Sequence, residues 1–184
     1  MNASLKTSIL HAAAVDLRNL VRDYYYYKDL QSAIVLKLTA ELKVAFPQYL
    51  TVFSKITTQS SLKLLLAYPS AKEMLLAEKE DIIEIIRSTA RFGINYASKK
   101  YDAILAAAKD AAIFGRALPS NAKRIKRYIE SFQQYQEVLD DILADLHDTV
   151  DSMQDTVVYE QTQLLQTLPG IAFLSSVVLI AEMG

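Results

Sequence analysis

Hydrophobic positions in the first 45 residues recur at the spacing of one helix face. Between residues 17 and 45 the steps alternate between three and four, with one double step, and neither Gly nor Pro interrupts the chain before Pro47. A helix that buries a single stripe has this pattern. It predicts one long helix from about residue 4 to residue 45. The stripe consists of Leu17, Val21, Tyr24, Gln31, Val35, Leu38, Leu42 and Ala45.

A longer repeat follows Pro119-Ser120-Asn121. Its positions alternate between steps of four and three for more than five heptads, which is the period of a coiled-coil helix. We predict one helix from about 121 to 167, roughly 70 Å long at 1.5 Å per residue. It should pair with the first helix, with its copy in a second chain, or with both. The repeat is Ile125, Ile129, Phe132, Gln136, Leu139, Leu143, Leu146, Val150, Met153, Val157, Glu160 and Leu164.

Two members of this repeat, Gln136 and Glu160, are polar. A polar residue at such a position can set the register of two helices and the number of partners. We therefore expect Gln136 to specify how the long helix is paired.

Shorter elements separate the two long patterns. Residues 46–77 form short pieces, and Ser70 followed by Glu73 has the spacing of a capping box. Residues 78–93 begin acidic and end basic, as suits a helix dipole, and residues 95–114 form a further helix. The predicted fold is all-α, with long antiparallel helices or a coiled coil and a cluster of short helices at one end.

Four consecutive tyrosines, Tyr24–Tyr27, lie within the first predicted helix. They span about one turn, so their side chains point in all directions. We expect two of them in the core and two near the surface. An exposed tyrosine can stack on a nucleic-acid base or pack against a partner helix.

The composition excludes several kinds of chemistry. The 184 residues include no Cys, so disulfides and thiolate sites are absent, as in many cytoplasmic proteins, and only His11 and His147 offer imidazoles. No phosphate-binding loop, dinucleotide-binding motif, zinc-protease motif or nucleophile elbow occurs. Aspartates at residues 140–155 lie at helical spacings beside the apolar repeat, and we interpret them as a solvated face and expect no metal site. The apolar run Ile171–Ala181 is too short to span a bilayer, which needs roughly 20 residues.

Charge is divided unevenly along the chain. Residues 1–127 hold all 20 Lys and Arg with 11 Asp and Glu, whereas residues 128–184 hold 10 Asp and Glu and no Lys or Arg. Such a division is typical of a chain with one surface for an anion, and nucleic acid is the commonest large anion in cells. The alternative is that the two parts attract each other, within one chain or between two.

A basic cluster lies in the first turns of the long second helix. Cations at a helix N-terminus are unfavourable by about 0.3–1 kcal/mol each, so an anion is expected nearby. A nucleic-acid phosphate and the acidic stretch of a neighbouring helix are the two candidates. The candidate nucleic-acid-binding side chains are Lys123, Arg124, Lys126 and Arg127 in this cluster, with Arg87 and Arg91.

The turn Leu168-Pro169-Gly170-Ile171 separates two predicted helices. Its glycine permits a tight turn, and backbone N–H groups at the start of the second helix can meet a DNA phosphate. Gly170 is therefore a further candidate binding residue. The apolar stretch that follows raises the question of what covers it: a membrane, this chain, or the rest of a domain.

Several segments, taken in order, resemble one family. They are LRNLVRDYYYYKDLQSAIVLKLTAELKVAFPQYLTVFS, LKLLLAYPSAKEMLL, IIEIIRSTARFG and QLLQTLPGIAFLSSVVLIAEMG. The first three are similar to the central helical region of transposases of the insertion-sequence 110/116/902 family. The last resembles the opening of that family's C-terminal transposase domain, with Ala172 where glycine is usual.

The resemblance implies a DNA transposase or recombinase that is guided by a structured RNA from the element's own end. Family members carry a DEDD carboxylate set for divalent metal and a serine nucleophile, and their coiled coil joins subunits. No catalytic residue carries over, because Asp16 and Asp23 lie in a helix pattern and Ser175 and Ser176 lie inside the apolar helix.

We therefore expect a fragment without chemistry or cofactor of its own. Residues 1–164 would be the central coiled-coil region and residues 165–184 the start of the C-terminal domain. The expected partners are DNA, the element's guide RNA and a second copy of the chain, but no membrane. Apolar residues of the last helix should lack partners in this chain: Leu174, Val177, Val178 and Ile180.

Overall fold

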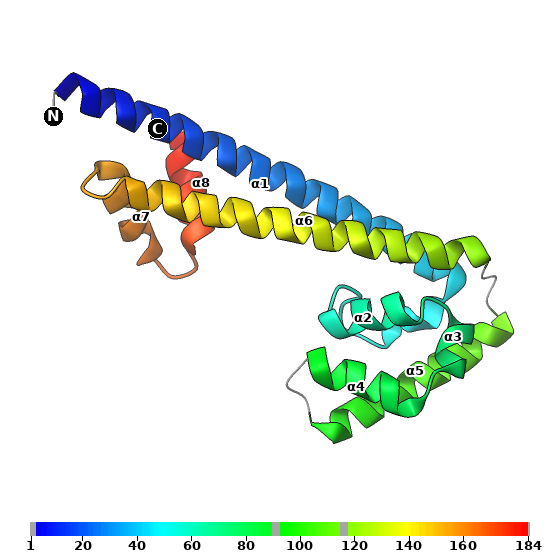
Figure 1. Cartoon of the computed structure of the whole chain (residues 1–184). Helices are drawn as coiled ribbons and strands as arrows, with labels where there is room; N and C mark the ends of the chain where they lie inside the picture. The colour runs from blue at the N-terminus through cyan, green and yellow to red at the C-terminus, as the bar shows by residue number, and fades with distance from the viewer. Residues whose placement is uncertain (1–2, 90–92, 115–117, 184) are drawn as a thin grey trace. The chain divides into compact units, whose positions relative to one another are not determined.

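The protein is all-helical throughout the part of the chain that the structure describes (Figure 1). The computed structural model describes the backbone of residues 3–89, 93–114 and 118–183, and the side chains of residues 11–89, 93–113 and 118–182. The elements are α1 (Ala3–Ala45), η1 (Pro47–Thr51), α2 (Gln59–Ala67), α3 (Ala71–Leu76), α4 (Lys79–Thr89), α5 (Ile94–Phe114), α6 (Pro119–Ser152), α7 (Val157–Gln166) and α8 (Phe173–Met183).

Contacts between residues divide the chain into two compact units. Unit 1 comprises residues 1–31 and 134–184, and unit 2 comprises residues 32–133. The helices α1 and α6 contribute to both. Each unit has its own hydrophobic core.

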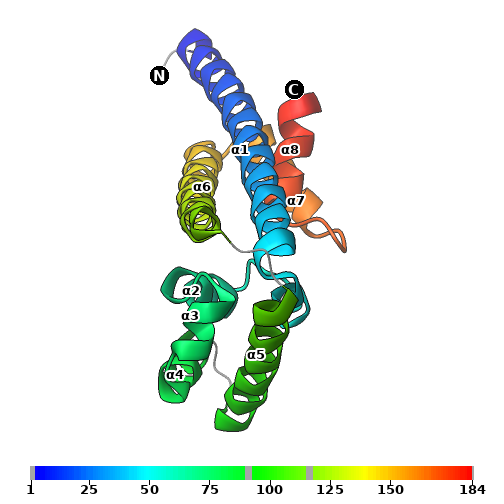
Figure 2. The same ribbon diagram turned by 90° about the vertical axis from the view of Figure 1, so that its right-hand side faces the viewer.

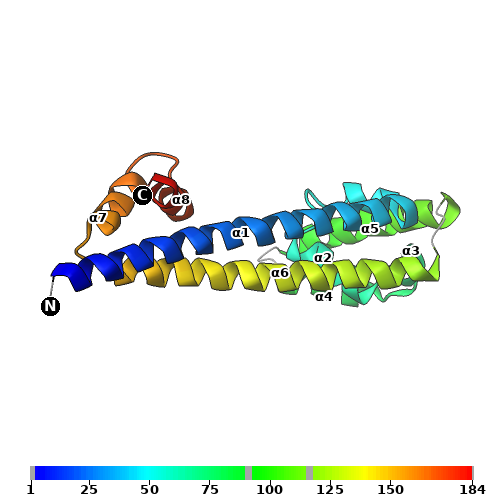
Figure 3. The same ribbon diagram turned by 90° about the horizontal axis from the view of Figure 1, so that it is seen from above.

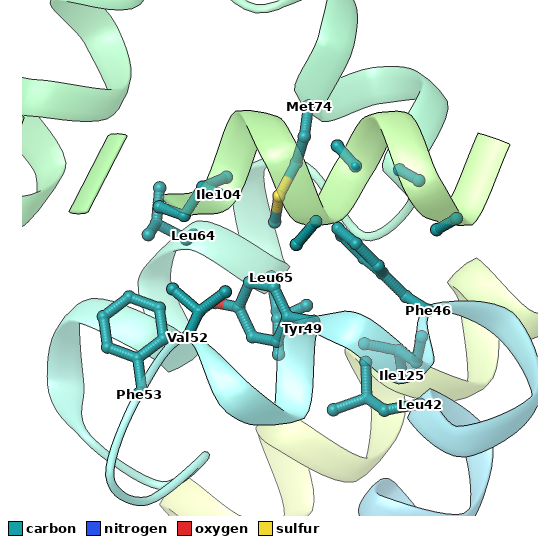
Figure 4. Packing of buried hydrophobic residues seen from close by; sticks show 14 of the residues in the cluster. Leu42, Phe46, Tyr49, Val52, Phe53, Leu64, Leu65, Met74, Ile104 and Ile125 are labelled. Carbon is teal, nitrogen blue, oxygen red and sulfur yellow. The ribbon is translucent and has the colours of Figure 1, made fainter. Parts of the chain in front are cut away.

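Unit 2 is built from the short elements and the adjoining ends of α1 and α6. The helix α5 packs against η1, α3 and α4, and α2 packs against α4 (Figure 2). This core encloses the aromatic side chains of Phe46 and Tyr49, which contact each other at 5.2 Å between ring centroids (Figure 4). The Tyr49 hydroxyl donates to the Ser61 carbonyl at 3.1 Å and accepts from the Ser61 hydroxyl at 3.2 Å. Burial raises the pKa of Tyr49 above its ordinary value.

The predicted capping box is confirmed at the start of α3. The Ser70 hydroxyl accepts from the backbone N–H of Glu73 at 3.2 Å, and the Glu73 carboxylate accepts from the backbone N–H of Ser70 at 3.1 Å. Two backbone groups that would otherwise lack partners are thereby satisfied. The capping box therefore defines the residue at which α3 begins.

Unit 1 joins the first part of α1 to the second part of α6, with the α7–α8 hairpin beside them (Figures 1 and 3). Leu17 and Val21 of α1 are buried together with Leu146 and Val150 of α6. Of the tyrosines in the run Tyr24–Tyr27, the first and last are partly buried and the middle two are exposed, as predicted.

A polar pair interrupts the apolar contacts of unit 1. The side-chain amide of Gln31 donates to the Gln136 carbonyl oxygen at 2.9 Å, and the Gln136 amide donates to Asp140 at 2.9 Å. Lys28 donates to Gln31 at 3.1 Å. Gln31 is buried, so this bond satisfies an amide that would otherwise cost free energy.

The prediction of one helix from 121 to 167 is wrong beyond Ser152, where α6 ends. Asp155 adopts a left-handed conformation with φ of 66°, and the Thr156 hydroxyl accepts from the Tyr159 N–H to begin α7. Asp and Thr side chains compete with helical hydrogen bonds, which favours a break here. The apolar repeat accordingly loses its buried face, since Val157 is 64% exposed and Leu164 67% exposed.

The turn between α7 and α8 has the predicted glycine geometry. Gly170 has φ of +89°, a left-handed conformation that disfavours other residues, although a Cβ there would meet nothing within 4 Å. The Ile171 N–H donates to the Leu168 carbonyl at 3.2 Å, which closes the turn. Glycine is therefore favoured at position 170 by the left-handed backbone conformation, and not by a lack of room for a side chain.

The expectation that the apolar residues of the last helix lack partners in this chain is wrong. Val177 is fully buried and Ile180 nearly so, and Leu174 and Val178 pack against the core that contains Leu17. Arg18 of α1 also donates from Nε to the carbonyl oxygen of Ala181 at 2.9 Å. The amphipathic spacing of α8 lets unit 1 cover most of its apolar surface.

Candidate nucleic-acid interface

Positive charge is concentrated in unit 2. This unit holds 16 Lys and Arg against 9 Asp and Glu, a formal charge of +7, whereas unit 1 holds 4 against 12, a formal charge of −8. The two compact units therefore differ in formal charge nearly as much as residues 1–127 and residues 128–184 do. A net positive charge attracts anions, so unit 2 is the part of the chain in which an anion site is expected.

The predicted cluster of cations lies in the first turns of α6, and one member is an ion-pair partner. The Arg124 guanidinium Nε lies 2.7 Å from Glu41 Oε1, near the end of α1. This Glu41 hydrogen bond raises the pKa of Arg124 above its usual value. The sequence left two candidate anions for the cluster, a nucleic-acid phosphate and the acidic stretch of a neighbouring helix. Arg124 binds a carboxylate of a neighbouring helix, Glu41 of α1, which lies outside the acidic residues 128–184.

Glu41 also receives a hydrogen bond from Asn121. The Asn121 amide donates to Glu41 Oε2 at 2.8 Å, while the Asn121 carbonyl oxygen accepts from the backbone N–H of Leu118 at 2.7 Å. Desolvation alone raises the pKa of Glu41, but the hydrogen bonds from Arg124 and Asn121 outweigh it and lower the pKa below its ordinary value. These bonds fix the beginning of α6 against the end of α1 within unit 2.

The other three cations of the cluster are open to a ligand. Lys123 and Arg127 are exposed, and Lys126 is partly exposed. Among the residues that the structure describes, no carboxylate lies within 4 Å of any of the three side chains. Three positive groups on two successive turns are suited to bind closely spaced phosphates.

A groove of about 680 Å³ is lined by two of these cations and by a further lysine from α3. Lys72 of α3 and Lys123 and Lys126 of α6 line it, and Ala71, Ala111 and Ala122 belong to its apolar walls. Glu73 also lines the groove, but its carboxylate binds the Ser70 N–H and hydroxyl. The groove therefore carries three amines and one carboxylate that is already bonded.

Two predicted arginines lie outside this cluster. Arg87 is exposed near the end of α4, and its Nη1 lies 3.8 Å from Glu84 Oε2, a surface ion pair of about 0–1 kcal/mol. Arg91 lies outside the described residues. Arg87 can contribute to the general positive field of unit 2.

Gly170 belongs to unit 1 and is exposed in the turn before α8. The first bond of the following helix joins the Ser176 N–H to the Ala172 carbonyl at 3.0 Å. Backbone N–H groups in the first turn of a helix have no partner within the helix, and they can meet an anion. The predicted turn geometry is therefore present.

Sequence reasoning missed Glu41, Asn121 and Lys72. Glu41 lies one position before Leu42 of the buried stripe, so a helix places it at the edge of the covered face. Asn121 precedes Arg124 by three residues, which puts both on one face of α6. Lys72 had no local signal, because only the packing of α3 places it beside α6.

No group of three or more His, Cys, Asp or Glu side chains is arranged to hold a metal ion within the described residues. In the same residues, no helix has the length and apolar character needed to cross a membrane. No family model, curated protein or solved structure matches this chain.

Proposed function

We propose that this chain is the assembly and nucleic-acid-binding region of a DNA transposase or recombinase of a mobile insertion sequence. The proposal combines the resemblance of four segments, taken in order, with one structural observation. That observation is a set of four cations on unit 2 with no carboxylate within 4 Å among the described residues: Lys72, Lys123, Lys126 and Arg127.

The positions of these cations support phosphate as the ligand. Amine and guanidinium groups neutralise backbone phosphates without reading sequence, and each contact releases counterions. Arg124 is ion-paired with Glu41, so its role is to hold the beginning of α6 against α1. The neighbouring side chains Lys123, Lys126 and Arg127 are then the ones that bind the ligand. We propose DNA and the element's guide RNA as the bound polymers.

We further propose that α1 and α6 form an antiparallel coiled coil in unit 1. Their buried positions keep the alternation of three and four, and Gln31 pairs with Gln136 across the contact. A buried polar pair can set register. The short helices of unit 2 form the cluster at one end, and the coiled coil provides self-association between subunits.

We propose that this chain binds nucleic acid without cleaving it. None of the residues matched by the resemblance is catalytic, and the divalent metal of the family would be held by its carboxylate set. Residues 1–164 correspond to the central region of the family and residues 165–184 to the opening of its C-terminal domain. A cytoplasmic location fits this role.

The test is binding of the full chain to a labelled RNA or DNA oligonucleotide at fixed salt. Neutralising Lys123, Lys126 and Arg127 together to Ala should lower the affinity by about tenfold or more. A matched control replaces the exposed residues Lys55, Lys63 and Lys99 of the same unit with Ala. Equal losses in both variants would mean that only net charge matters. Cleavage with Mg²⁺ that a point mutation abolishes would contradict the absence of chemistry.

Two alternatives belong to other classes. A stand-alone nucleic-acid-binding module would bind in the same way but have no link to transposition. A structural coiled-coil adaptor fits the pairing of α1 with α6 within one chain, which the Gln31–Gln136 bond joins. Such an adaptor would self-associate without binding nucleic acid at moderate salt. The binding measurement separates the adaptor from the other two.

A further inference from the structure

The acidic unit carries a face that lacks cationic partners. Asp141, Asp145 and Asp148 of α6 are exposed at i, i+4 and i+7, and the exposed Ala144 lies among them. No Lys or Arg lies within 4 Å of these carboxylates among the described residues. Like charges at this spacing destabilise a helix, so this face gains from a positive partner.

The basic unit carries a groove of the matching chemistry. Lys72, Lys123 and Lys126 line it, and its apolar walls are formed largely by small side chains. Small side chains at a contact let two helices approach closely, and lysine stems can lie along apolar surface while the amines reach out. A helix that presents aspartates around an alanine matches such a groove in charge.

We propose that this groove binds the acidic α6 face of a second copy of the chain. Lys123, Lys126 and the three aspartates belong to one continuous helix, so they cannot contact each other within a chain. Every copy carries both surfaces, so each copy can offer its acidic face to one neighbour and receive another in its groove. The proposed function assigns the same three lysines to phosphates, so nucleic acid and a second copy would compete for this groove. Self-association is therefore measured without nucleic acid.

The test uses reversals of charge on the two surfaces of the full chain. One variant is Lys72→Glu, Lys123→Glu and Lys126→Glu, and the other is Asp141→Lys, Asp145→Lys and Asp148→Lys. After nuclease treatment, sedimentation velocity measures self-association at about 0.05 M and 0.5 M NaCl. Each variant alone should associate about tenfold more weakly than the wild type at low salt, since its two surfaces now repel.

An equimolar mixture of the two variants should regain the wild-type association, because each then supplies the charge that the other lacks. Circular dichroism checks that both variants fold. The control reverses Lys55, Lys63 and Lys99 to Glu, which changes the net charge equally without touching the groove. Failure of the mixture to recover, loss in the control as large as in the groove variant, or association that neither reversal weakens would overturn the proposal.

Discussion

The two units bury their apolar residues in different ways, although the same two helices contribute to both. Unit 2 surrounds the aromatic side chains of Phe46 and Tyr49 with several short elements. Unit 1 relies on a stripe along α1 and α6, covered by α8 and interrupted by the Gln31–Gln136 pair. One continuous helix can therefore contribute to a packed aromatic core along one part and to a stripe with a polar pair along another.

The surfaces of the two units differ as strongly as their cores. Unit 2 has a formal charge of +7 and unit 1 of −8. Neither value depends on a few exceptional residues, since Lys and Arg are spread over the short helices and Asp over α6. Unit 2 is therefore suited to anions, and unit 1 is suited to cationic surfaces.

A substitution in the aromatic core of unit 2 should destabilise the protein most. Phe46→Ala removes a ring that is fully buried against Tyr49, and a cavity of this size costs about 3–5 kcal/mol of unfolding free energy. Urea denaturation followed by circular dichroism measures the loss. An unchanged midpoint would contradict the packing of η1 in this core.

The covering of unit 1 by α8 is tested by Val177→Asp. A carboxylate at this fully buried position lacks a partner, and the variant should lose about 3 kcal/mol of unfolding free energy. Leu179→Asp is the matched control on the same helix, because Leu179 is 41% exposed and its substitution should be nearly neutral. Equal stability of the two variants would mean that α8 does not pack in this chain.

A smaller effect is expected at the polar pair of unit 1. Gln136→Ala leaves the buried Gln31 side-chain amide without its acceptor, and the unfolding free energy should fall by about 1–3 kcal/mol. Gln134→Ala is the control, because Gln134 is exposed on α6. Replacing both Gln31 and Gln136 with Leu should restore stability but allow α1 and α6 to pair in more than one register. Disulfide trapping between engineered cysteine pairs on the two helices would then give several products in place of one.

The smallest effect concerns Glu41 and its dependence on pH. The folded state lowers the pKa of Glu41, so its contribution to stability is present above the unfolded pKa of about 4.3 and is lost as pH falls through the folded value. Glu41→Gln should therefore lower the melting temperature slightly at pH 7 and have no such effect in strong acid. Glu130→Gln, at an exposed position of unit 2, is the control.

Periodicity predicted most of the fold because it reports which face of a helix is buried. The stripe from Leu17 to Ala45 and the repeat from Ile125 to Met153 are buried or partly buried, apart from Gln136. The repeat could not reveal the break at Asp155, since Val157 and Leu164 continue its spacing on an exposed face. Local side-chain hydrogen bonds, and not hydrophobicity, determine where α6 ends.

The candidate site was predicted less completely, because its geometry depends on contacts between distant residues. The cluster from Lys123 to Arg127 was visible as a run of charge. The sequence could not show that Arg124 is ion-paired while the other three cations are open. That distinction depends on the position of Glu41, which is 83 residues from Arg124 in sequence. Packing of α3 against α5 likewise decides where Lys72 lies.

We expect the open cations of unit 2 to bind nucleic acid through its phosphates. The most direct test measures the affinity of the full chain for one oligonucleotide across a series of NaCl concentrations. The logarithm of the association constant should fall linearly with the logarithm of salt, and Lys123→Ala, Lys126→Ala and Arg127→Ala combined should flatten the slope by about two to three. No binding at low salt, or an unchanged slope in the triple variant, would contradict the claim.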